Sequence, residues 1–358
     1  MLKIILRSIL IVIGVFAFVA TMLPLLPSNE AWIRIFDFPR LQIAALLSLV
    51  IIGLLPLLQI RRRRSVVLLV AVTAAFAYQI WRIIPYTPLH GAEALQDRIC
   101  ADKSQVTLLS ANVLQENRQA QRLLDLIGQV RPDMVLLLET NEWWDRHLAP
   151  LDADYGYALR KPQDNTYGIH LFSKLKLIDP DIRFLIEDYV PSIETQVELP
   201  SGAIIDFHGV HPKPPPLQDT EQRDAELMIV ARNVRERAKP AIVAGDLNDV
   251  AWSRTTRSFQ EISGLLDPRI GRGLYPTFNA NWPLLKWPLD HVFFEASFTL
   301  IRMEVMPDIG SDHFPFFISL CHRPESAPRQ AVPAPEREDI QESREAVREG
   351  REKARGKP

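Results

Sequence analysis

The sequence has few cysteines and almost no net charge, and its apolar residues are unevenly distributed. Its 358 residues include only Cys100 and Cys321, too few for a disulfide-rich scaffold or a zinc site made of thiolates. A formal net charge of −2 gives no overall attraction to nucleic acid or to an anionic membrane. A non-specific DNA-binding protein is more often basic. The length leaves room for about two domains.

Charged residues are absent from three apolar segments near the N-terminus, at 8–29, 41–60 and 65–81. Each approaches the roughly 20 apolar residues that a helix needs to cross a bilayer. A cleaved signal peptide could explain the first segment and buried core helices the other two. A signal peptide leaves two segments unexplained, however, and soluble core helices rarely lack charge for so long. We therefore predict a membrane anchor over residues 1–88, with three transmembrane helices at about 8–28, 41–60 and 65–84.

Basic residues predict the orientation of this anchor. Lys3 and Arg7 precede the first span, and Arg61–Arg64 separate the second from the third. Positively charged loops stay in the cytoplasm, whereas the segment 30–40 has charges of both signs and can face outward. We expect a multi-pass protein of the inner (plasma) membrane with a cytoplasmic N-terminus, contacting the lipid bilayer through three helices. The domain after the anchor would be extracytoplasmic, or periplasmic in a Gram-negative bacterium.

Residues 323–358 contain few large apolar side chains and a dense mixture of Arg, Glu and Lys. Such a segment cannot bury enough apolar surface to order itself. We expect a disordered charged tail, with at most a transient helix around Ile340–Lys353.

Residues 100–322 show the patterns of a layered α/β domain. Residues 120–130 have the apolar spacing of an amphipathic helix, and Met134–Leu138 is a continuous apolar run typical of a strand buried on both faces. Further elements are expected as strands at 105–113, 167–173, 193–199, 203–210, 241–244, 291–295 and 316–320, and as a helix at 220–237. Helices and strands alternate at first and strands then follow one another, which predicts an α/β (α+β) domain with mixed sheets covered by helices.

Polar side chains stand at the ends of most of these predicted strands. They are Asn112, Glu139, His208, His211, Asp246, Asn248, Asp290, Asp312 and His313. Loops at the strand ends of such sheets converge on one crevice. Each residue alone could be a turn, cap or surface residue. As a set they provide carboxylate, amide and imidazole groups without a cysteine or serine nucleophile motif, and such oxygen ligands suit Mg²⁺, Mn²⁺ or Ca²⁺ better than structural zinc.

Ordered motifs carry a family resemblance. They are Ser-Ala-Asn112-Val, Pro-Asp-Met-Val-Leu-Leu-Leu-Glu139, Tyr167-Gly-Ile-His-Leu-Phe-Ser-Lys, His211-Pro, Gly-Asp246-Leu-Asn248, Leu-Asp290-His and Gly-Ser-Asp312-His313. With them, residues 104–322 resemble the endonuclease/exonuclease/phosphatase superfamily, which includes DNase I-like nucleases, abasic-site endonucleases, neutral sphingomyelinases and inositol polyphosphate phosphatases. The resemblance implies a four-layered α/β sandwich of the DNase I-like type.

The resemblance also implies roles for the matching residues. Glu139, with Asn112 and Asp312, would hold the metal, Mg²⁺ or Mn²⁺, which would polarise a phosphoryl oxygen. Asp246 would orient and deprotonate the attacking water, and Asn248 would place that water in line.

His313, paired with Asp290, and His211 would hold the phosphate and stabilise its developing charge. His208 matches no family position, so we assign it to a strand face or to the surroundings of the site. Leu114 stands where abasic-site endonucleases commonly carry an acidic residue, which argues against that branch.

Aromatic residues near the motifs have two explanations. Phe278, Trp282 and Trp287 precede Asp290, where family members often build a wall of the substrate pocket, and core packing explains them about as well. Trp143-Trp144 could flank the same cleft or simply pack. In the resembled fold the first and last strands are antiparallel neighbours, which would bring Cys100 and Cys321 together. An oxidising compartment permits a disulfide there, and free thiols are the alternative.

We predict a membrane-anchored, metal-dependent phosphoesterase acting as a nuclease or as a lipid or headgroup phosphodiesterase. Its partners would be a phosphate-ester substrate and the bilayer, and no protein partner is implied. The alternative is a catalytically inactive, membrane-bound binding module of the same fold. It predicts loss of metal-binding or water-activating residues, and the sequence retains them.

Overall fold

The structure, a computed structural model, describes residues 1–57, 63–214 and 220–356. Arg61 and Arg62 of the arginine run, and the last three residues of the predicted second span, lie outside these ranges. The helices are α1 (Leu2–Met22), α2 (Ala31–Arg34), α3 (Arg40–Leu54), α4 (Arg63–Ile83), α5 (Ala120–Val130), α6 (Glu142–His147), α7 (Glu221–Arg237), α8 (Arg254–Ser263) and α9 (Arg337–Arg355). Short 3-10 turns include Ile35–Asp37, which follows α2.

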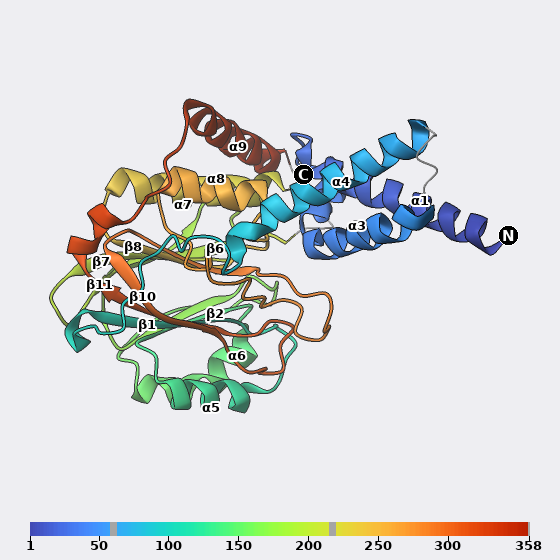
Figure 1. Cartoon of the computed structure of the whole chain (residues 1–358). Helices are drawn as coiled ribbons and strands as arrows, with labels where there is room; N and C mark the ends of the chain where they lie inside the picture. The colour runs from blue at the N-terminus through green and yellow to red at the C-terminus, as the bar shows by residue number, and fades with distance from the viewer. Residues whose placement is uncertain (58–62, 215–219, 357–358) are drawn as a thin grey trace.

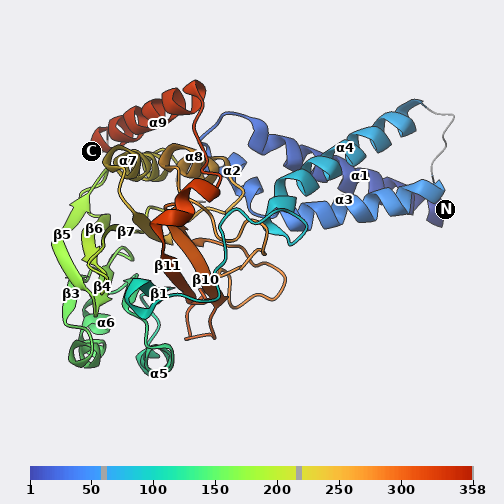
Figure 2. The ribbon, with the colours of Figure 1, turned by 60° about the vertical axis from the view of Figure 1, so that its left-hand side comes forward.

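The N-terminal helices form a separate bundle. Helices α1, α3 and α4 pack against one another through buried residues such as Ala17, Leu47 and Val72. They extend away from the rest of the protein, and the N-terminus lies at the far end of the bundle (Figures 1 and 2). Two helices, Leu2–Leu25 and Ser65–Tyr86, are long and apolar enough to cross a membrane. A third span exists only if residues 31–37 and 40–54, which meet at a bend of 71°, are counted together.

The remainder of the chain contains two mixed β-sheets. The strands are β1 (Gln105–Asn112), β2 (Met134–Leu138), β3 (Tyr157–Lys161), β4 (Ile169–Ser173), β5 (Lys176–Phe184), β6 (Pro191–Glu198), β7 (Ile204–Val210), β8 (Ala241–Asp246), β9 (Asp290–Phe294), β10 (Phe298–Val305) and β11 (Phe316–His322). One sheet has the order β10-β11-β1-β2-β4-β3 and the other β5-β6-β7-β8-β9. β1 runs parallel to β2, and β7 parallel to β8.

The sheets pack face to face with helices on both outer faces (Figure 1). Leu136 of β2 and Phe207 of β7 belong to the core between the sheets. Leu137, the next residue in β2, faces the other way and packs beneath α5 and α6. The continuous apolar run of β2 is therefore explained by burial on both faces. Helices α7 and α8 cover the outer face of the second sheet, which confirms the predicted four-layered α/β sandwich.

The C-terminal segment differs from its prediction as a disordered tail. Residues 337–355 form helix α9, which lies along α7 (Figure 1). Val347 is buried against the α7 and α8 core, and a Cβ on Gly350 would lie 2.3 Å from the Cβ of Ala225. The buried residues of α9 are Ser343, Val347 and Gly350, whose spacing places them on one face of the helix. Average composition hides that spacing, which is why the expectation of disorder is wrong here.

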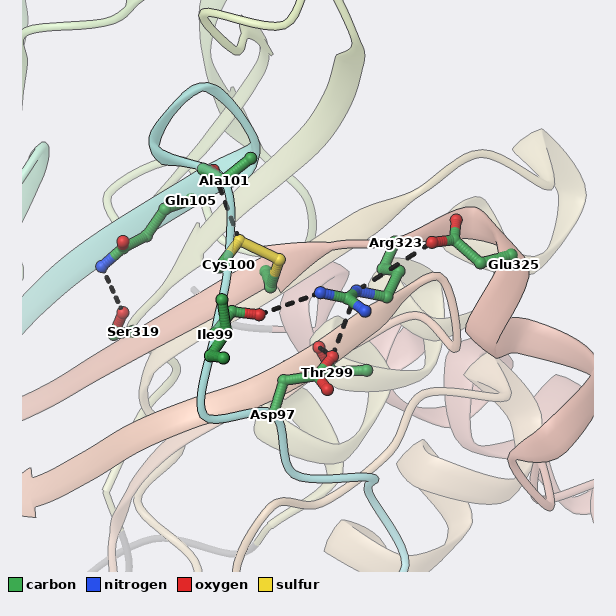
Figure 3. The surroundings of a disulfide bond; sticks show 10 residues. Asp97, Ile99, Cys100, Ala101, Gln105, Thr299, Ser319, Arg323 and Glu325 are labelled. Carbon is green, nitrogen blue, oxygen red and sulfur yellow. Dashed lines mark hydrogen bonds and ion pairs between the residues drawn. A yellow bond between two sulfur atoms is a disulfide. The ribbon is translucent and has the colours of Figure 1, made fainter.

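Cys100 and Cys321 form a disulfide, as the resemblance implied. β1 and β11 are antiparallel neighbours, with Gln105 opposite Cys321. Just beyond the bond, Arg323 donates a hydrogen bond to the carbonyl oxygen of Ile99 at 2.9 Å (Figure 3). The bond thus joins the segment just before β1, the first strand, to β11, the last strand.

We expect removal of this disulfide to lower stability by about 2–4 kcal/mol, because the bond closes a long loop and so restricts the unfolded chain. Thermal unfolding of the whole chain in detergent, with and without reductant, measures the effect. A Cys100→Ala/Cys321→Ala variant should already melt at the lower temperature and should not respond to reductant. A wild-type protein whose melting temperature ignores reductant would contradict this expectation.

Candidate functional site

The site lies where strands of both sheets end together. β1 and β2 are parallel, so Asn112 at the end of β1 and Glu139 just after β2 reach the same edge. β7 and β8 are parallel in the other sheet, and they bring His211 beside Asp246. The two edges face each other, since Asn112 Nδ2 lies 3.2 Å from Asp246 Oδ2.

Asn112 and Glu139 form the first part of the site. Asn112 donates from Nδ2 to Glu139 Oε1 at 2.8 Å, and its Oδ1 accepts the backbone N–H of Leu114 at 3.0 Å. This second bond fixes the amide with its nitrogen toward the carboxylates. Asn112 therefore orients Glu139 here and does not present its oxygen as a ligand. Glu139 has a left-handed backbone, with φ of 63°, and such uncommon conformations in non-glycine residues cluster at functional sites.

The loop after β8 holds Asp246 and Asn248. Asp246 Oδ1 accepts the backbone N–H of Asn248 at 2.8 Å, and Asn248 Nδ2 donates to the carbonyl oxygen of Pro212 at 2.9 Å. Asn248 also has a left-handed backbone, with φ of 51°. Only glycine fits at position 245, because a Cβ there would lie 1.9 Å from the backbone oxygen of Val210. The close approach of β7 to β8 at this glycine sets the position of Asp246.

Asp290, His313 and Asp246 form a buried line of carboxylate, imidazole and carboxylate. His313 Nδ1 lies 2.8 Å from Asp290 Oδ2, and its Nε2 lies 3.5 Å from Asp246 Oδ2. Burial alone lowers the pKa of His313, but Asp290 and then Asp246 outweigh burial and raise that pKa to about 10. Burial raises the pKa of Asp246, and the charge of His313 opposes the shift. His313 is therefore a cation at neutral pH, with one ring nitrogen directed at Asp246.

His211 and Asp312 complete the cluster. His211 Nε2 is 3.9 Å from Glu139 Oε1, and its Nδ1 is 3.9 Å from Asp246 Oδ2. Asp312 lines the same cavity as Glu139, and its backbone oxygen accepts from Ala280 at 2.7 Å. Burial raises the pKa of Asp312, and the charge of Glu139 adds to this shift while His313 opposes it.

The donor set fits a hard divalent cation. Four carboxylates, those of Glu139, Asp246, Asp290 and Asp312, share the site, and among the described residues none of them has a lysine or arginine ion pair. Asp246, Asp290 and His313 also form a group that could hold a metal ion, with ligand atoms within 4.8 Å of one another. Asp290 is already bonded to Nδ1 of His313, and Asp290 and Asp246 are both almost fully buried. Glu139 and Asp312 are therefore the more accessible of the four carboxylates.

All eight residues predicted for the site converge, and they come from six separate segments of the chain. His208 does not join them: it is buried in β7 and lines a separate small cavity with Val230. Trp144 is core packing, and Trp143 stacks on His147 outside the cleft.

An apolar cavity of about 650 Å³ adjoins the cluster. Of its apolar lining, only Phe278 and Trp287 were anticipated from the sequence. The apolar residues that line it are Phe278, Leu285, Trp287 and Leu289 from the segment before β9, Ile35, Phe36, Phe38 and Pro39 from the segment between α2 and α3, and Pro214. The first set includes two of the aromatic residues proposed as a pocket wall, whereas Trp282 is exposed and does not line it. The second set comes from the segment 30–40. Only the charges of this segment were used in the sequence analysis, to predict the orientation of the anchor.

A sequence model described as "Endonuclease/Exonuclease/phosphatase family" matches residues 109–313. A search of curated proteins finds no significant match. Among solved structures, D. rerio TDP2 complexed with a single-strand DNA product superposes with a TM-score of 0.52 at 20% identity, covering 61% of this chain and 99% of that one.

The human Nocturnin catalytic domain with bound sulfate anion gives a TM-score of 0.51 at 17% identity, covering 63% of this chain and 96% of that one. An endonuclease/exonuclease/phosphatase from Beutenbergia cavernae gives 0.51 at 19% identity, covering 62% of this chain and 72% of that one. At these identities the likeness establishes the fold.

Proposed function

The chain belongs to the endonuclease/exonuclease/phosphatase family, and from this premise we propose that it is a membrane-anchored hydrolase of phosphate esters that requires Mg²⁺ or Mn²⁺. The observation that carries the proposal is the convergence of three carboxylates and two imidazoles on one cavity, with a fourth carboxylate, Asp290, held against His313. A cluster this rich in negative charge suits a divalent cation together with a phosphate group.

Glu139 and Asp312 would hold the ion, with Asn112 keeping Glu139 in position through its 2.8 Å hydrogen bond. When bound, the ion supplies Lewis-acid chemistry and neutralises charge on the phosphoryl oxygens. Asp246 would accept a proton from the attacking water. Asn248 fixes the Asp246 carboxylate by a backbone hydrogen bond to Oδ1. The other oxygen, Oδ2, faces Asn112 and His313 within the site and would accept the proton.

His313 and His211 would bind the phosphate. Asp290 holds the ring of His313 by the 2.8 Å contact at Nδ1, which leaves Nε2 to donate toward a phosphate oxygen. A fixed cationic donor stabilises charge that develops in the transition state without having to reorganise. His211 lies between Glu139 and Asp246, where its ring would donate to an oxygen of a phosphate bound beside these carboxylates.

Two features support the membrane-anchored, extracytoplasmic arrangement. The anchor helices are apolar enough to span a bilayer, and the Cys100–Cys321 disulfide suits an oxidising compartment. The substrate would be a nucleic acid or a lipid headgroup ester. The D. rerio TDP2 neighbour, whose structure holds a DNA product, is the precedent for the first. An inactive binding module is disfavoured, because the sequence retains every residue proposed for metal binding and water activation.

We expect hydrolysis of bis(4-nitrophenyl) phosphate by the full chain in detergent to stop when EDTA removes the metal, and to resume on addition of Mg²⁺ or Mn²⁺. A Glu139→Gln variant loses one ligand charge, so its half-saturating Mg²⁺ concentration should rise at least about tenfold. Titration of the rate against Mg²⁺ provides the measurement, and Mn²⁺ binding followed by electron paramagnetic resonance gives a readout independent of turnover.

Glu142→Gln is the matched control, since Glu142 lies in α6 outside the cavity. Its metal dependence should equal that of the wild type. Full activity in EDTA would rule out the metal requirement, and an absence of turnover with bound Mn²⁺ would argue for the binding module.

A further inference from the structure

The membrane anchor builds one wall of the apolar cavity. Ile35, Phe36, Phe38 and Pro39 lie between α2 and α3, and they line the same cavity as Asp246 and His313. A segment that only tethered the domain to the membrane would not need to line the cavity beside these residues. The cavity volume, about 650 Å³, is in the usual range for small-molecule sites.

Aromatic rings connect the anchor to the catalytic cluster without a break. Phe38 contacts Trp287 edge to face, with ring centroids 5.9 Å apart, and Trp287 stacks on Phe278 at 6.2 Å. Phe278 in turn lies 4.8 Å from the ring of His313. Trp287 Nε1 has no hydrogen-bond partner among the described residues. The cavity thus changes from polar at His313 to apolar at the anchor.

Polar contacts hold this wall against the sandwich domain. Arg34 donates to Thr255 Oγ1 at 2.8 Å, and the carbonyl oxygen of Asp37 accepts from Trp252 Nε1 at 2.7 Å. Gln42, in the first turn of α3, donates to the carbonyl oxygen of Leu284 at 2.9 Å. These bonds lie before, within and after residues 35–39, so the segment has a defined position beside the residues of the site.

The rim of the cavity lies at the base of the anchor bundle. Ile35, which is 40% exposed, and Leu285 both line the cavity, and Leu284 beside them is 83% exposed. With the helices of the anchor in a bilayer, as proposed above, this apolar rim meets the membrane surface. A hydrocarbon chain could then pass from the bilayer into the cavity without crossing water.

Nucleic acid fits this cavity poorly. Grooves that bind single strands pair aromatic platforms with lysine and arginine along the backbone, and no lysine or arginine is among the described residues that line this cavity. The aromatic side chains here meet aliphatic ones and a membrane anchor, whereas a nucleic acid would require a basic path for its phosphates.

We propose that the substrate is a membrane lipid carrying a phosphate ester, bound with its phosphate at His211 and His313 and its hydrocarbon portion between residues 35–39 and residues 278–289. This assignment rests on the proposed phosphoesterase function. It makes residues 35–39 of the anchor part of the substrate-binding site, and their role is to admit an ester directly from the bilayer.

The test compares two esters with the same leaving group, methyl 4-nitrophenyl phosphate and dodecyl 4-nitrophenyl phosphate, using the full chain in detergent with Mg²⁺. We expect kcat/KM for the dodecyl ester to exceed that for the methyl ester at least about tenfold, because the chain adds apolar contacts that persist in the transition state. Ile35→Asn and Phe38→Ala should each lower this ratio about fivefold or more.

Trp32→Ala is the matched control. Trp32 is exposed in α2 and does not line the cavity, so the ratio should stay at the wild-type value. A ratio near one, a ratio unchanged by Ile35→Asn and Phe38→Ala, or a higher kcat/KM for single-stranded DNA would each overturn the lipid assignment and leave the phosphoesterase function intact. If the protein hydrolysed none of these substrates while it still bound Mn²⁺, the proposed function itself would be overturned.

Discussion

Replacement of Asp246 by Asn is expected to lower kcat by a factor of about 10² to 10⁴, the usual contribution of a positioned general base. Asn has nearly the same shape and can still accept the backbone N–H of Asn248 at its Oδ1. It cannot accept a proton from water. The loss would therefore reflect chemistry at one oxygen and not collapse of the loop.

Folding should survive this change. Asp246 is almost fully buried, and burial raises its pKa, so its ionised form is unfavourable in the folded protein. A neutral amide relieves that penalty, and the melting temperature should stay the same or rise. Such an exchange of stability for activity is common where charges are held together for catalysis.

Asp206→Asn is the matched control. Asp206 is an equally buried aspartate near the start of β7, where it accepts from Gln196 Nε2 at 3.1 Å, away from the cavity. Its kcat should remain within about twofold of the wild type, as expected for a residue that does not touch the reacting groups. Hydrolysis of bis(4-nitrophenyl) phosphate by detergent-purified chains compares the two. Equal activity of Asp246→Asn and the wild type would remove Asp246 from the mechanism.

Replacement of Asp249 by Ala is expected to lower stability by about 3–5 kcal/mol, because it removes a buried negative charge that faces two buried arginines. Asp249 Oδ2 lies 3.1 Å from Arg223 Nη2 and 3.8 Å from Arg34 Nη2. All three side chains are almost fully buried. Arg34 belongs to the anchor, so one carboxylate joins the anchor to the loop that carries Asn248.

Activity should fall together with stability. Arg223 also donates to the carbonyl oxygen of Asn248 at 2.9 Å, so loss of Asp249 removes one of the two carboxylates that position the arginine bonded to this loop. Thermal unfolding of the full chain should show a melting temperature lower by on the order of 10 °C. Asp249→Asn, which keeps the shape and loses the charge, should lie between Asp249→Ala and the wild type.

The control for this experiment is Asp308→Ala. Asp308 pairs with Arg122 at 3.7 Å, with both side chains about half exposed, and exposed pairs of this kind contribute about 0–1 kcal/mol. If Asp249→Ala melted no lower than Asp308→Ala, the buried network would not hold the anchor to the sandwich domain.

Local sequence patterns were sufficient where a feature depends on neighbouring residues. The continuous apolar run at 134–138 predicted a strand buried on both faces, and β2 has those bounds. Apolar spacing predicted α5. Three strands were missed for identifiable reasons: β5 contains Pro180 at an irregularity in its pairing, β3 is a half-exposed edge strand, and β10 lies at the other edge. Edge and irregular strands lack the alternation that reveals a strand in sequence.

By itself, then, the sequence determined which segments are apolar enough for a membrane, and its motifs predicted which polar residues would gather at the strand ends. Those features depend on composition and on the order of neighbouring residues in the chain. Only the tertiary structure decided that Asn112 turns its nitrogen toward Glu139, that α9 packs on α7, and that residues 35–39 of the anchor close over the cavity. Each of these depends on contacts between residues far apart in the chain, and no local period encodes such contacts.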